Sequence, residues 1–330
     1  MILRTLRVSA PLLLLATVFA APAGAQAPAR QTATAQFTDQ RPAASSGLRI
    51  SIDYRNPTDP AAKPFGVART IVRLAPGARI DTGVPARCTL DDADLMANGS
   101  RGCPGSSIVG SGVVTLSTTD ASPTATMDVV LINNANELIF LTQTQTTPST
   151  RMVIRSPVRG NTITTDIPRL PGGPPDGTAA LRTAELRIGA QSQRDGRNVL
   201  GYVTTPPACP ASNVFTNSTT FDYFDGVSQS VPSNSPCIDT APPAVRLTGP
   251  SRSRCLRGNL RARVRVTDTS PLRGVVVRLN GRRVKSTRSA RFGLKVRHRR
   301  LRKGRNRLTV LAVDRRGNRF TLTRRVSRCR

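Results

Sequence analysis

The chain is poor in the residues on which catalysis and metal binding most often depend. Its 330 residues include no tryptophan and one histidine, His298. Ser-His-Asp catalysis needs a histidine beside the serine, whereas His298 stands in a run of basic residues where we expect a solvated loop. The nucleophile-elbow, P-loop, zinc-protease and dinucleotide-binding motifs are also missing from the sequence. These absences favour a protein that is not an enzyme and uses no cofactor and no metal.

The sequence contains no C-x-x-C pair, the commonest spacing for a metal or redox site, although it contains six cysteines. An even number of cysteines in an exported chain indicates three disulfides, for which several connectivities are possible. The spacing suggests that sequence neighbours pair, so that each bridge closes one local unit. The expected bridges are Cys88–Cys103, Cys209–Cys237 and Cys255–Cys329.

No apolar run after the N-terminus is long enough to span a membrane. The N-terminus has a charged start with Arg4 and Arg7, a short apolar stretch, and small residues at 23–25. This pattern is typical of a secretory signal peptide, and the apolar stretch is shorter than the roughly 20 residues that a bilayer requires. We therefore expect residues 1–25 to be removed, and a mature protein beginning near Gln26 that is secreted and either extracellular or associated with the cell wall.

Acidic residues are nearly absent from one part of the chain. Residues 245–330 contain 29 lysines and arginines but only two acids, Asp268 and Asp314; this gives +27, whereas the whole chain carries +30. A localised basic excess indicates a polyanionic partner. The alternative is compositional drift without a partner, because four of the 49 basic residues are lysine and charge of one sign also serves solubility.

Composition also predicts the domain boundaries. Residues 26–47 are rich in Ala, Thr, Gln and Ser and predict a flexible leader. A proline pair predicts a stiff linker at 241–244, between a β-rich domain of unknown function at 48–240 and a basic domain at 245–330. A cluster of proline and glycine at 168–177 is expected to be a long loop of the first domain.

Short apolar runs separated by turn residues indicate β-structure almost throughout. Hairpins are predicted at 127–142, 151–167 and 275–284, the last with an Asn-Gly turn. The segment 179–188 is the best candidate for a helix, but it alternates well enough to be a strand. Many short strands separated by turns favour β-sandwiches.

In the basic domain, arginines alternate with apolar residues at 261–266, 292–297 and 319–324. Period-2 alternation sends the two sets to opposite faces of a sheet, so we expect a small apolar core beneath arginine-covered faces. Like charges opposite each other across strands are destabilising. A dense basic loop follows the second segment and supplies the candidate polyanion-binding residues, which are Arg297, Arg299, Arg300, Arg302, Lys303 and Arg305.

A set of turns and strands in the basic domain resembles a bacterial Ig-like domain. It comprises an Asp-Ser element at 268–272, a strand with an Asn-Gly turn at 275–281, a Leu-x-x-Gly corner at 301–310 and an Asp-x-x-Gly-Asn turn at 312–318. The resemblance implies a small β-sandwich of the kind that serves as an adhesive or spacer module on exported proteins. The arginine density departs from that family, and so does a Cys255–Cys329 bridge, which would join the first and last strands.

The larger domain has a weaker resemblance. Pro85, Cys88 and the segment 103–112 are similar to a segment of uncharacterised exported proteins of high-GC bacteria, which implies no activity. The expected fold class is therefore all-β, with a larger N-terminal β-sandwich-like domain followed by a small basic Ig-like β-sandwich.

Acidic and aromatic clusters offer alternatives that we weigh against simpler interpretations. The run Asp91-Asp92-Ala-Asp94 could hold calcium, but it lacks the full calcium-loop pattern and favours a helix start or a turn. Asp222, Asp225 and Asp239 are expected to be ordinary solvated acids. An aromatic cluster could line a carbohydrate site, but in a chain without tryptophan a packing role is favoured; it comprises Phe215, Phe221, Tyr223 and Phe224.

We therefore predict a non-catalytic exported cell-envelope or extracellular protein whose basic Ig-like domain attaches to anionic cell-wall or extracellular polymer. The first alternative is an exported nucleic-acid or lipid-headgroup binder. Exposed aromatics among the arginines would favour nucleic acid, and Phe292 and Phe320 are both expected on the apolar side. The second alternative is an extracellular hydrolase that uses carboxylates of the N-terminal domain. The sequence predicts no membrane span and indicates no particular oligomeric state.

Overall fold

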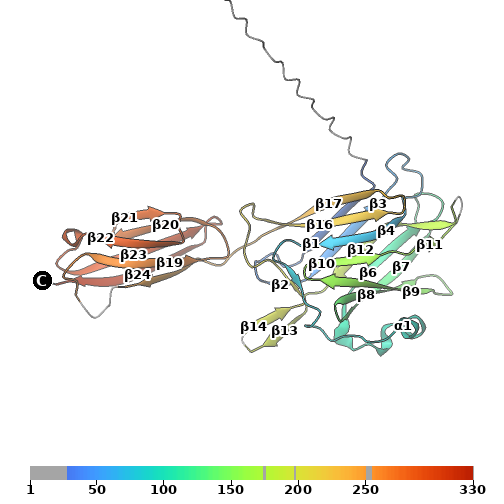
Figure 1. Cartoon of the computed structure of the whole chain (residues 1–330), viewed down its shortest axis with the longest axis horizontal. Coiled ribbons are helices and arrows are strands. Elements are labelled where there is room, and N and C mark those ends of the chain that lie inside the picture. Colours follow the sequence, from blue (N-terminus) through green and yellow to red (C-terminus); the bar gives the residue numbers. More distant parts are fainter. Residues whose placement is uncertain (1–27, 174–175, 197, 250–254, 330) are drawn as a thin grey trace, which may run out of the picture.

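The structure, a computed structural model, describes residues 28–173, 176–196, 198–249 and 255–329. The predicted signal peptide at 1–25 lies outside the described residues. The described chain is all-β and forms two bodies joined by a short connector (Figure 1). Its α-helix is α1 (Asp92–Asn98), with 3₁₀ turns η1 (Gly99–Gly102), η2 (Gly105–Ser107) and η3 (His298–Arg300). No helix in this part of the chain is both long and apolar enough to cross a membrane.

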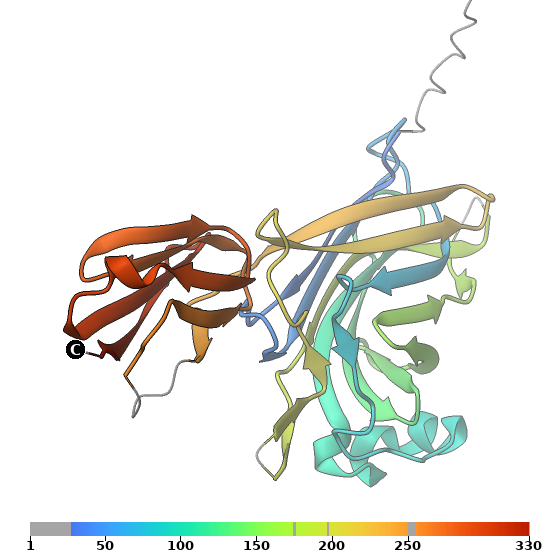
Figure 2. The same ribbon diagram turned by 60° about the vertical axis from the view of Figure 1, so that its left-hand side comes forward.

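The N-terminal domain is built on one large antiparallel sheet that folds over into two layers (Figure 2). The strand order is β1-β3-β12-β6-β7-β8-β9-β10-β4-β16-β17, with β11 beside β12. These strands are β1 (Gln31–Phe37), β3 (Leu48–Tyr54), β4 (Val67–Arg73), β6 (Ile108–Ser117), β7 (Ala125–Asn134), β8 (Glu137–Thr144), β9 (Arg151–Arg159), β10 (Thr162–Asp166), β11 (Leu170–Pro171), β12 (Thr178–Ile188), β16 (Val214–Tyr223) and β17 (Ser228–Pro236).

The two edge strands of this sheet meet through side-chain hydrogen bonds. The backbone N–H of Ala35 in β1 donates to Ser233 Oγ in β17 at 2.8 Å, and that of Phe37 donates to Ser235 Oγ at 3.1 Å. Because both serines are buried, these bonds satisfy backbone groups that an edge strand would otherwise leave unpaired. The large sheet is thereby closed into the expected sandwich-like domain.

Two small sheets lie beside the large one. The first has the order β2-β15-β5, and the second is the hairpin β13-β14. Their bounds are β2 (Ser45–Ser46), β5 (Arg79–Ile80), β13 (Ser192–Asp195), β14 (Asn198–Gly201) and β15 (Val203–Thr204).

The prediction of a flexible leader at 26–47 is wrong where the structure describes those residues. Residues 31–37 form β1, which pairs along its whole length with β3. Ala33, Ala35 and Phe37 are buried while the residues between them are exposed. The strand alternates with period 2, but two of its four buried side chains are alanine and a third is glutamine, so the composition resembles that of a loose polar segment. The N-terminal domain therefore begins before residue 48.

The predicted hairpins are confirmed. The segments at 127–142 and 151–167 form β7-β8 and β9-β10, and 179–188 lies within strand β12 rather than a helix. The loop expected at 168–177 contains the short strand β11.

The aromatic residues Phe215, Phe221 and Tyr223 pack in the core, as expected, and are at most 4% exposed. Phe37 and Phe215 stack edge to face with ring centroids 5.8 Å apart, as do Tyr54 and Phe221. Phe224 is the exception in this cluster, because it is exposed.

The acidic run at 91–94 forms the start of α1, as the simpler interpretation predicts. The side chain of Asp91 caps the helix by accepting from the backbone N–H of Asp94. Asp92 forms an ion pair with Arg155, with Nε and Oδ1 2.7 Å apart. The Cys88–Cys103 disulfide encloses this helix.

The C-terminal domain is a small β-sandwich of two sheets around an apolar core. One sheet has the order β18-β19-β22 and the other β21-β20-β23-β24, and the predicted hairpin at 275–284 is β20-β21. The strands are β18 (Ala244–Thr248), β19 (Leu260–Thr267), β20 (Leu272–Leu279), β21 (Arg282–Thr287), β22 (Arg291–Val296), β23 (Gly304–Asp314) and β24 (Arg319–Arg328).

The structure joins the six cysteines in the three pairs that the spacing predicts. The expectation that Cys255–Cys329 joins the first and last strands is wrong in one respect. Cys255 follows the first strand, β18, and precedes an isolated bridge between Leu256 and Arg328. The disulfide therefore fastens the connection between β18 and β19 to the end of β24.

The predicted linker at 241–244 is shorter than expected, and the two domains contact each other beside it. Ala244 already belongs to β18, and Pro243 is buried. The side chain of Asn318 donates to the backbone oxygen of Asp239 at 2.9 Å, and the N–H of Cys209 donates to the oxygen of Thr269 at 2.7 Å. The connector is thus part of a packed junction.

Candidate functional site

The basic loop that precedes β23 is held in place by two buried residues. Leu301 is 2% exposed and packs in the domain core, and its backbone oxygen accepts from Arg328 Nη1 at 2.8 Å. Asn306 is also 2% exposed; its Nδ2 donates to the oxygens of Arg302 and Gly304, and its Oδ1 accepts from the N–H of Arg302. These bonds fix the backbone from which the arginines project.

The same asparagine ties the loop to the turn between β20 and β21. Asn280 Nδ2 donates to Asn306 Oδ1 at 2.8 Å. Asn280 and Gly281 have φ values of 48° and 84°, the left-handed conformation that a two-residue hairpin turn requires and that Asn-Gly adopts readily. Asn280, which the sequence indicates as a turn residue, therefore also helps to hold the loop in position.

Five arginines from the turn and the loop line one cleft of about 650 Å³, which we call the arginine cleft. Leu279, Asn280 and Val284 also line it. A cleft of this size falls within the range of small-ligand sites. The five arginines are Arg282, Arg283, Arg299, Arg300 and Arg302.

Three of the six predicted binding residues line the arginine cleft, namely Arg299, Arg300 and Arg302. The other three, Arg297, Lys303 and Arg305, are exposed but do not line it. Arg282 and Arg283 were absent from the prediction, although they directly follow the Asn-Gly turn that the sequence indicates. The hydrogen bond between Asn280 and Asn306 shows that this turn adjoins the loop.

His298 is half-buried rather than solvated, so that expectation is wrong. Its backbone N–H donates to Asn259 Oδ1 at 2.8 Å, and its Nε2 is buried with no hydrogen-bond partner in the described part of the chain.

A second basic surface lies on the outer face of the sheet β18-β19-β22. Along β19, the alternation places Arg261, Arg263 and Arg265 on the exposed side and apolar residues in the core, as predicted. Arg261 is paired with Lys295 of β22. Shallow depressions flanked by Arg263 and other cations lie over Gly293, the residue of this face that has no side chain.

Ion pairing differs sharply between the domains. All eight ion pairs formed between described residues lie in the N-terminal domain; Arg155, for example, pairs with both Asp92 and Glu137. The described part of the C-terminal domain contains 26 of the 29 lysines and arginines of residues 245–330. None of these 26 lies within 4.0 Å of a carboxylate of a described residue.

The acids of the C-terminal domain gather at the domain junction with Asp239, which lies just after Cys237. Asp239 was expected to be solvated, but it is 5% exposed. Asp268 and Asp314 lie beside it. Burial, and secondarily the charges of Asp239 and Asp314, raise the pKa of Asp268 to about 6. Sequence reasoning missed this cluster because its members lie far apart in the chain.

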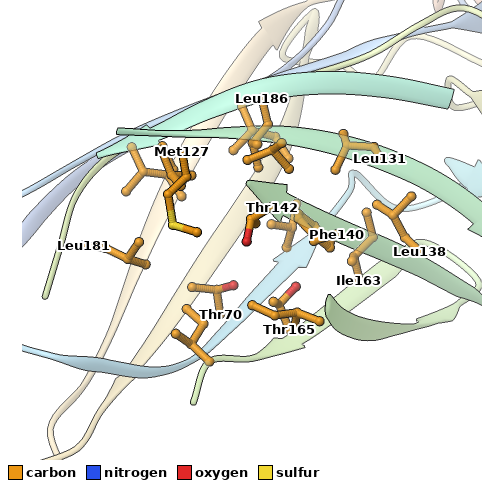
Figure 3. A pocket seen from close by; sticks show the side chains of 18 of the residues that line it. Thr70, Met127, Leu131, Leu138, Phe140, Thr142, Ile163, Thr165, Leu181 and Leu186 are labelled. Atoms are coloured by element: carbon orange, nitrogen blue, oxygen red, sulfur yellow. The ribbon is translucent and has the colours of Figure 1, made fainter. Parts of the chain in front are cut away.

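The N-terminal domain contains an apolar cavity of about 100 Å³ between its two layers (Figure 3). Every lining residue is aliphatic, aromatic or a methionine except three threonines, Thr70, Thr142 and Thr165. Thr142 donates to the backbone oxygen of Met152, and Thr165 accepts from Ser156, so these two hydroxyls are already bonded. The lining includes no Asp or Glu, so this cavity is not the acid-lined pocket that the hydrolase alternative requires.

No protein-family model matches the chain. No curated protein matches it either.

Solved structures give only distant similarity. The fibronectin(III)-like modules of CbhA from Clostridium thermocellum share 11% identity at a TM-score of 0.25, over 90% of this chain and 94% of that one. Cadherin domains of protocadherin gamma B7 share 9% sequence identity at a TM-score of 0.23, over 89% of this chain and 76% of that one. A Ca²⁺-stabilized adhesin with which an Antarctic bacterium binds ice shares 10% sequence identity at a TM-score of 0.20, over 90% of this chain and 98% of that one. At these TM-scores the similarities carry no argument about this chain.

Proposed function

We propose that this is a non-catalytic, secreted protein of the cell envelope or extracellular space, and that its basic domain is a bacterial Ig-like module that binds anionic polymer. The arginine cleft is the proposed contact site, and the exposed face of β18-β19-β22 extends it. The ligand groups would be the phosphates or carboxylates of a wall or extracellular polymer.

The observation that carries this proposal is the set of 26 described cations without a carboxylate partner. The N-terminal domain shows that this chain does pair its charges where acids are available. Unpaired charge of one sign destabilises a compact domain by self-repulsion, so a polyanion that neutralised it would bind favourably. Arginine suits this role, because its guanidinium presents a planar fork to phosphate or carboxylate.

The arrangement of aromatics favours generic polyanion binding over nucleic-acid recognition. Binding of single strands relies on exposed aromatic rings on which bases stack. Phe292 is half-buried, and Lys285 Nζ lies 5.0 Å from its ring centroid. Phe320 is 38% exposed, contrary to the expectation that it faces the core. One exposed ring among so many arginines is a weak base-stacking platform.

Salt dependence tests the proposal. The mature protein would be titrated with wall polymer, heparin and DNA at about 50 and 200 mM salt, and the affinity should fall steeply at the higher salt because bound counterions are released. Similar affinities and slopes for the three polymers would support a generic electrostatic site. If none of them binds at the lower salt, the proposal fails and the charge is compositional drift.

Two matched variants separate a defined site from diffuse charge. In the first, Arg282, Arg283, Arg299 and Arg300 of the arginine cleft are replaced by serine. In the second, four cations of the sheet face are replaced instead; these are Arg261, Arg263, Arg265 and Lys295. Both variants lose four charges, so a larger loss of affinity in the first assigns binding to the cleft. Equal losses would contradict the cleft as the site.

The apolar cavity supports a second candidate function, the uptake of a small apolar group by the N-terminal domain. Cavities of about 150 Å³ lined by aliphatic side chains stay dry and take up benzene or xenon. The cavity here is of similar order and is lined almost wholly by apolar side chains. A ring or a short branched chain would fit it.

Benzene is a suitable probe for the cavity. It should raise the melting temperature of the protein, since a ligand that binds only the folded state stabilises that state. Ala184 lines the cavity and is buried, so Ala184→Leu should fill part of the space and abolish the shift. An unchanged melting temperature of the natural protein at saturating benzene would contradict this function.

A further inference from the structure

Three aspartates from distant parts of the chain meet where the two domains join. Asp239 follows the Cys209–Cys237 unit, Asp268 directly follows β19, and Asp314 is the last residue of β23. Each offers one carboxylate oxygen, and these three oxygens all lie within 4.8 Å of one another. Asp268 and Asp314 are also the only acids of residues 245–330. The basic domain thus directs all of its negative side-chain charge to this point.

Asp239 and Asp314 are buried and Asp268 is half-buried, and two of the three carboxylates are incompletely bonded. Asp239 is 5% exposed, and although its Oδ1 accepts from the N–H of Ala241 at 2.9 Å, its Oδ2 has no hydrogen-bond partner among the described residues. Asp268 Oδ2 likewise has none. A buried polar atom without a partner is destabilising, and a buried charge more so.

No basic side chain of the described residues neutralises the cluster. Among the described residues, no lysine or arginine lies within 4.0 Å of any of the three carboxylates, although the chain has 49 such residues. Carboxylates this close cannot all remain ionised without a counter-charge. A proton on one of the three would remove only part of the repulsion, whereas a divalent cation would also satisfy the unpartnered oxygens.

We propose that Asp239, Asp268 and Asp314 form a calcium site that fixes the basic domain to the N-terminal domain. Calcium takes oxygen ligands at about 2.3–2.6 Å, so two oxygens on opposite sides of one ion are about 5 Å apart. The three oxygens fall within this span. A set made only of oxygens suits a hard cation rather than zinc, which prefers nitrogen and sulfur.

Hydrogen bonds from neighbouring groups hold the aspartates of the site in position. Both carboxylate oxygens of Asp314 accept from Asn318, one from its backbone N–H and one from Nδ2, each at 2.8 Å. The same Nδ2 donates to the backbone oxygen of Asp239 across the junction. The hydroxyls of Thr269 and Ser270, in the turn after Asp268, are buried and have no hydrogen-bond partner among the described residues.

A bound ion would fix the orientation of the two domains and would have no catalytic role. Without it, the carboxylates repel one another across the junction, and a proton on one of them removes only part of that repulsion; with it, they become shared ligands that hold the domains together. The surrounding cations reduce the local concentration of any divalent ion, so we expect an affinity of the order found in extracellular modules, about 10⁻⁴–10⁻³ M. The basic surfaces would then be presented at a fixed angle to the N-terminal domain.

Calorimetric titration of the chelator-treated mature protein with calcium tests the site without any polymer, so its result is independent of the proposed function. We expect one calcium ion per chain and saturation of the site at about 10 mM calcium. We also expect bound calcium to slow amide hydrogen exchange at residues 237–244 and 268–271. Absence of binding would overturn the proposal. Tighter binding of magnesium than of calcium would overturn the assignment to calcium.

Variants locate the ion. Asp268→Asn retains Oδ1, which accepts from the N–H of Thr269, and Asp239→Asn retains the acceptor for Ala241. Each should weaken calcium binding at least about tenfold, a change of about 1.4 kcal/mol. Each should also keep or raise the melting temperature of the calcium-free protein, because a repelling charge is removed; this readout separates a lost ligand from a misfolded chain.

The control Asp94→Asn changes an exposed acid of α1 and should bind calcium as the natural protein does. Unchanged binding in both junction variants would refute the site.

Discussion

Arg246 and Arg265 lie directly opposite each other in the ladder between β18 and β19, and both are exposed. Arg265 is paired on its other side with Arg291 of β22, so three guanidinium groups form one row across the sheet. Like charges in directly opposed positions destabilise a sheet. This row is a cost to the folded domain that a bound polyanion would relieve.

Replacing the central arginine should stabilise the free protein. Arg265→Glu turns two repulsive pairs into attractive ones, and we expect about 0.5–1 kcal/mol of added stability at low salt, measured by denaturant unfolding. The control is Arg273→Glu, because Arg273 is exposed and falls at a ladder irregularity without a cross-strand partner. A gain no greater than that of the control would show that the row itself is not strained.

Removal of the Cys255–Cys329 disulfide should destabilise the basic domain. Its cysteines are 74 residues apart, compared with 15 for Cys88–Cys103. In the chain-entropy model the longer loop contributes about 4 kcal/mol and the shorter about 3 kcal/mol. Paired Cys→Ser variants, followed by thermal unfolding, compare the two. Equal stability of the Cys255/Cys329 variant and the natural protein would contradict this role for the bridge.

The N-terminal strand should be essential to the first domain. Asn217 is fully buried; its Oδ1 accepts from the N–H of Ala75, and its Nδ2 donates to the oxygen of Ala35 in β1. Deleting the mature chain through Phe37 would remove β1 and leave Asn217 Nδ2 and the hydroxyls of Ser233 and Ser235 without their partners in that strand. We expect loss of cooperative unfolding, measured by circular dichroism during heating. A truncated protein that unfolds like the natural one would restore the flexible-leader interpretation.

The sequence predicts the parts of this structure that depend on residues close together in the chain better than those that depend on residues far apart. Hairpins such as β20-β21 and the pairing of sequence-adjacent cysteines depend on short segments, so turn residues and spacing indicate them. Strand β1 depends on partners such as Ser233, almost two hundred residues away, and its alanines give little hydrophobic signal. Asp239, Asp268 and Asp314 meet only because the connector packs against two turns of the other domain. For the same reason, half of the predicted binding residues line the arginine cleft while two of its arginines were missed.

The buried side chain of Asn306 should control polyanion binding although it carries no charge. Asn306→Ala removes the acceptor of Arg302 N–H and Asn280 Nδ2, and the donor to two loop oxygens. Unpartnered buried groups cost about 1–3 kcal/mol, so the loop should detach from the turn and the five arginines of the cleft should disperse. We expect faster hydrogen exchange at residues 298–304 and weaker heparin binding at constant net charge.

The matched control for this last experiment is Thr309→Ala, on the same strand β23 but three residues away and therefore on its opposite face. It should leave both loop exchange and binding unchanged. If Asn306→Ala loosens the loop while heparin binds as tightly as before, total charge is sufficient for binding and the shape of the cleft is irrelevant. If binding falls in step with loop order, the cleft acts as a preorganised site, because ordering its arginines in advance reduces the entropy lost when the polymer binds.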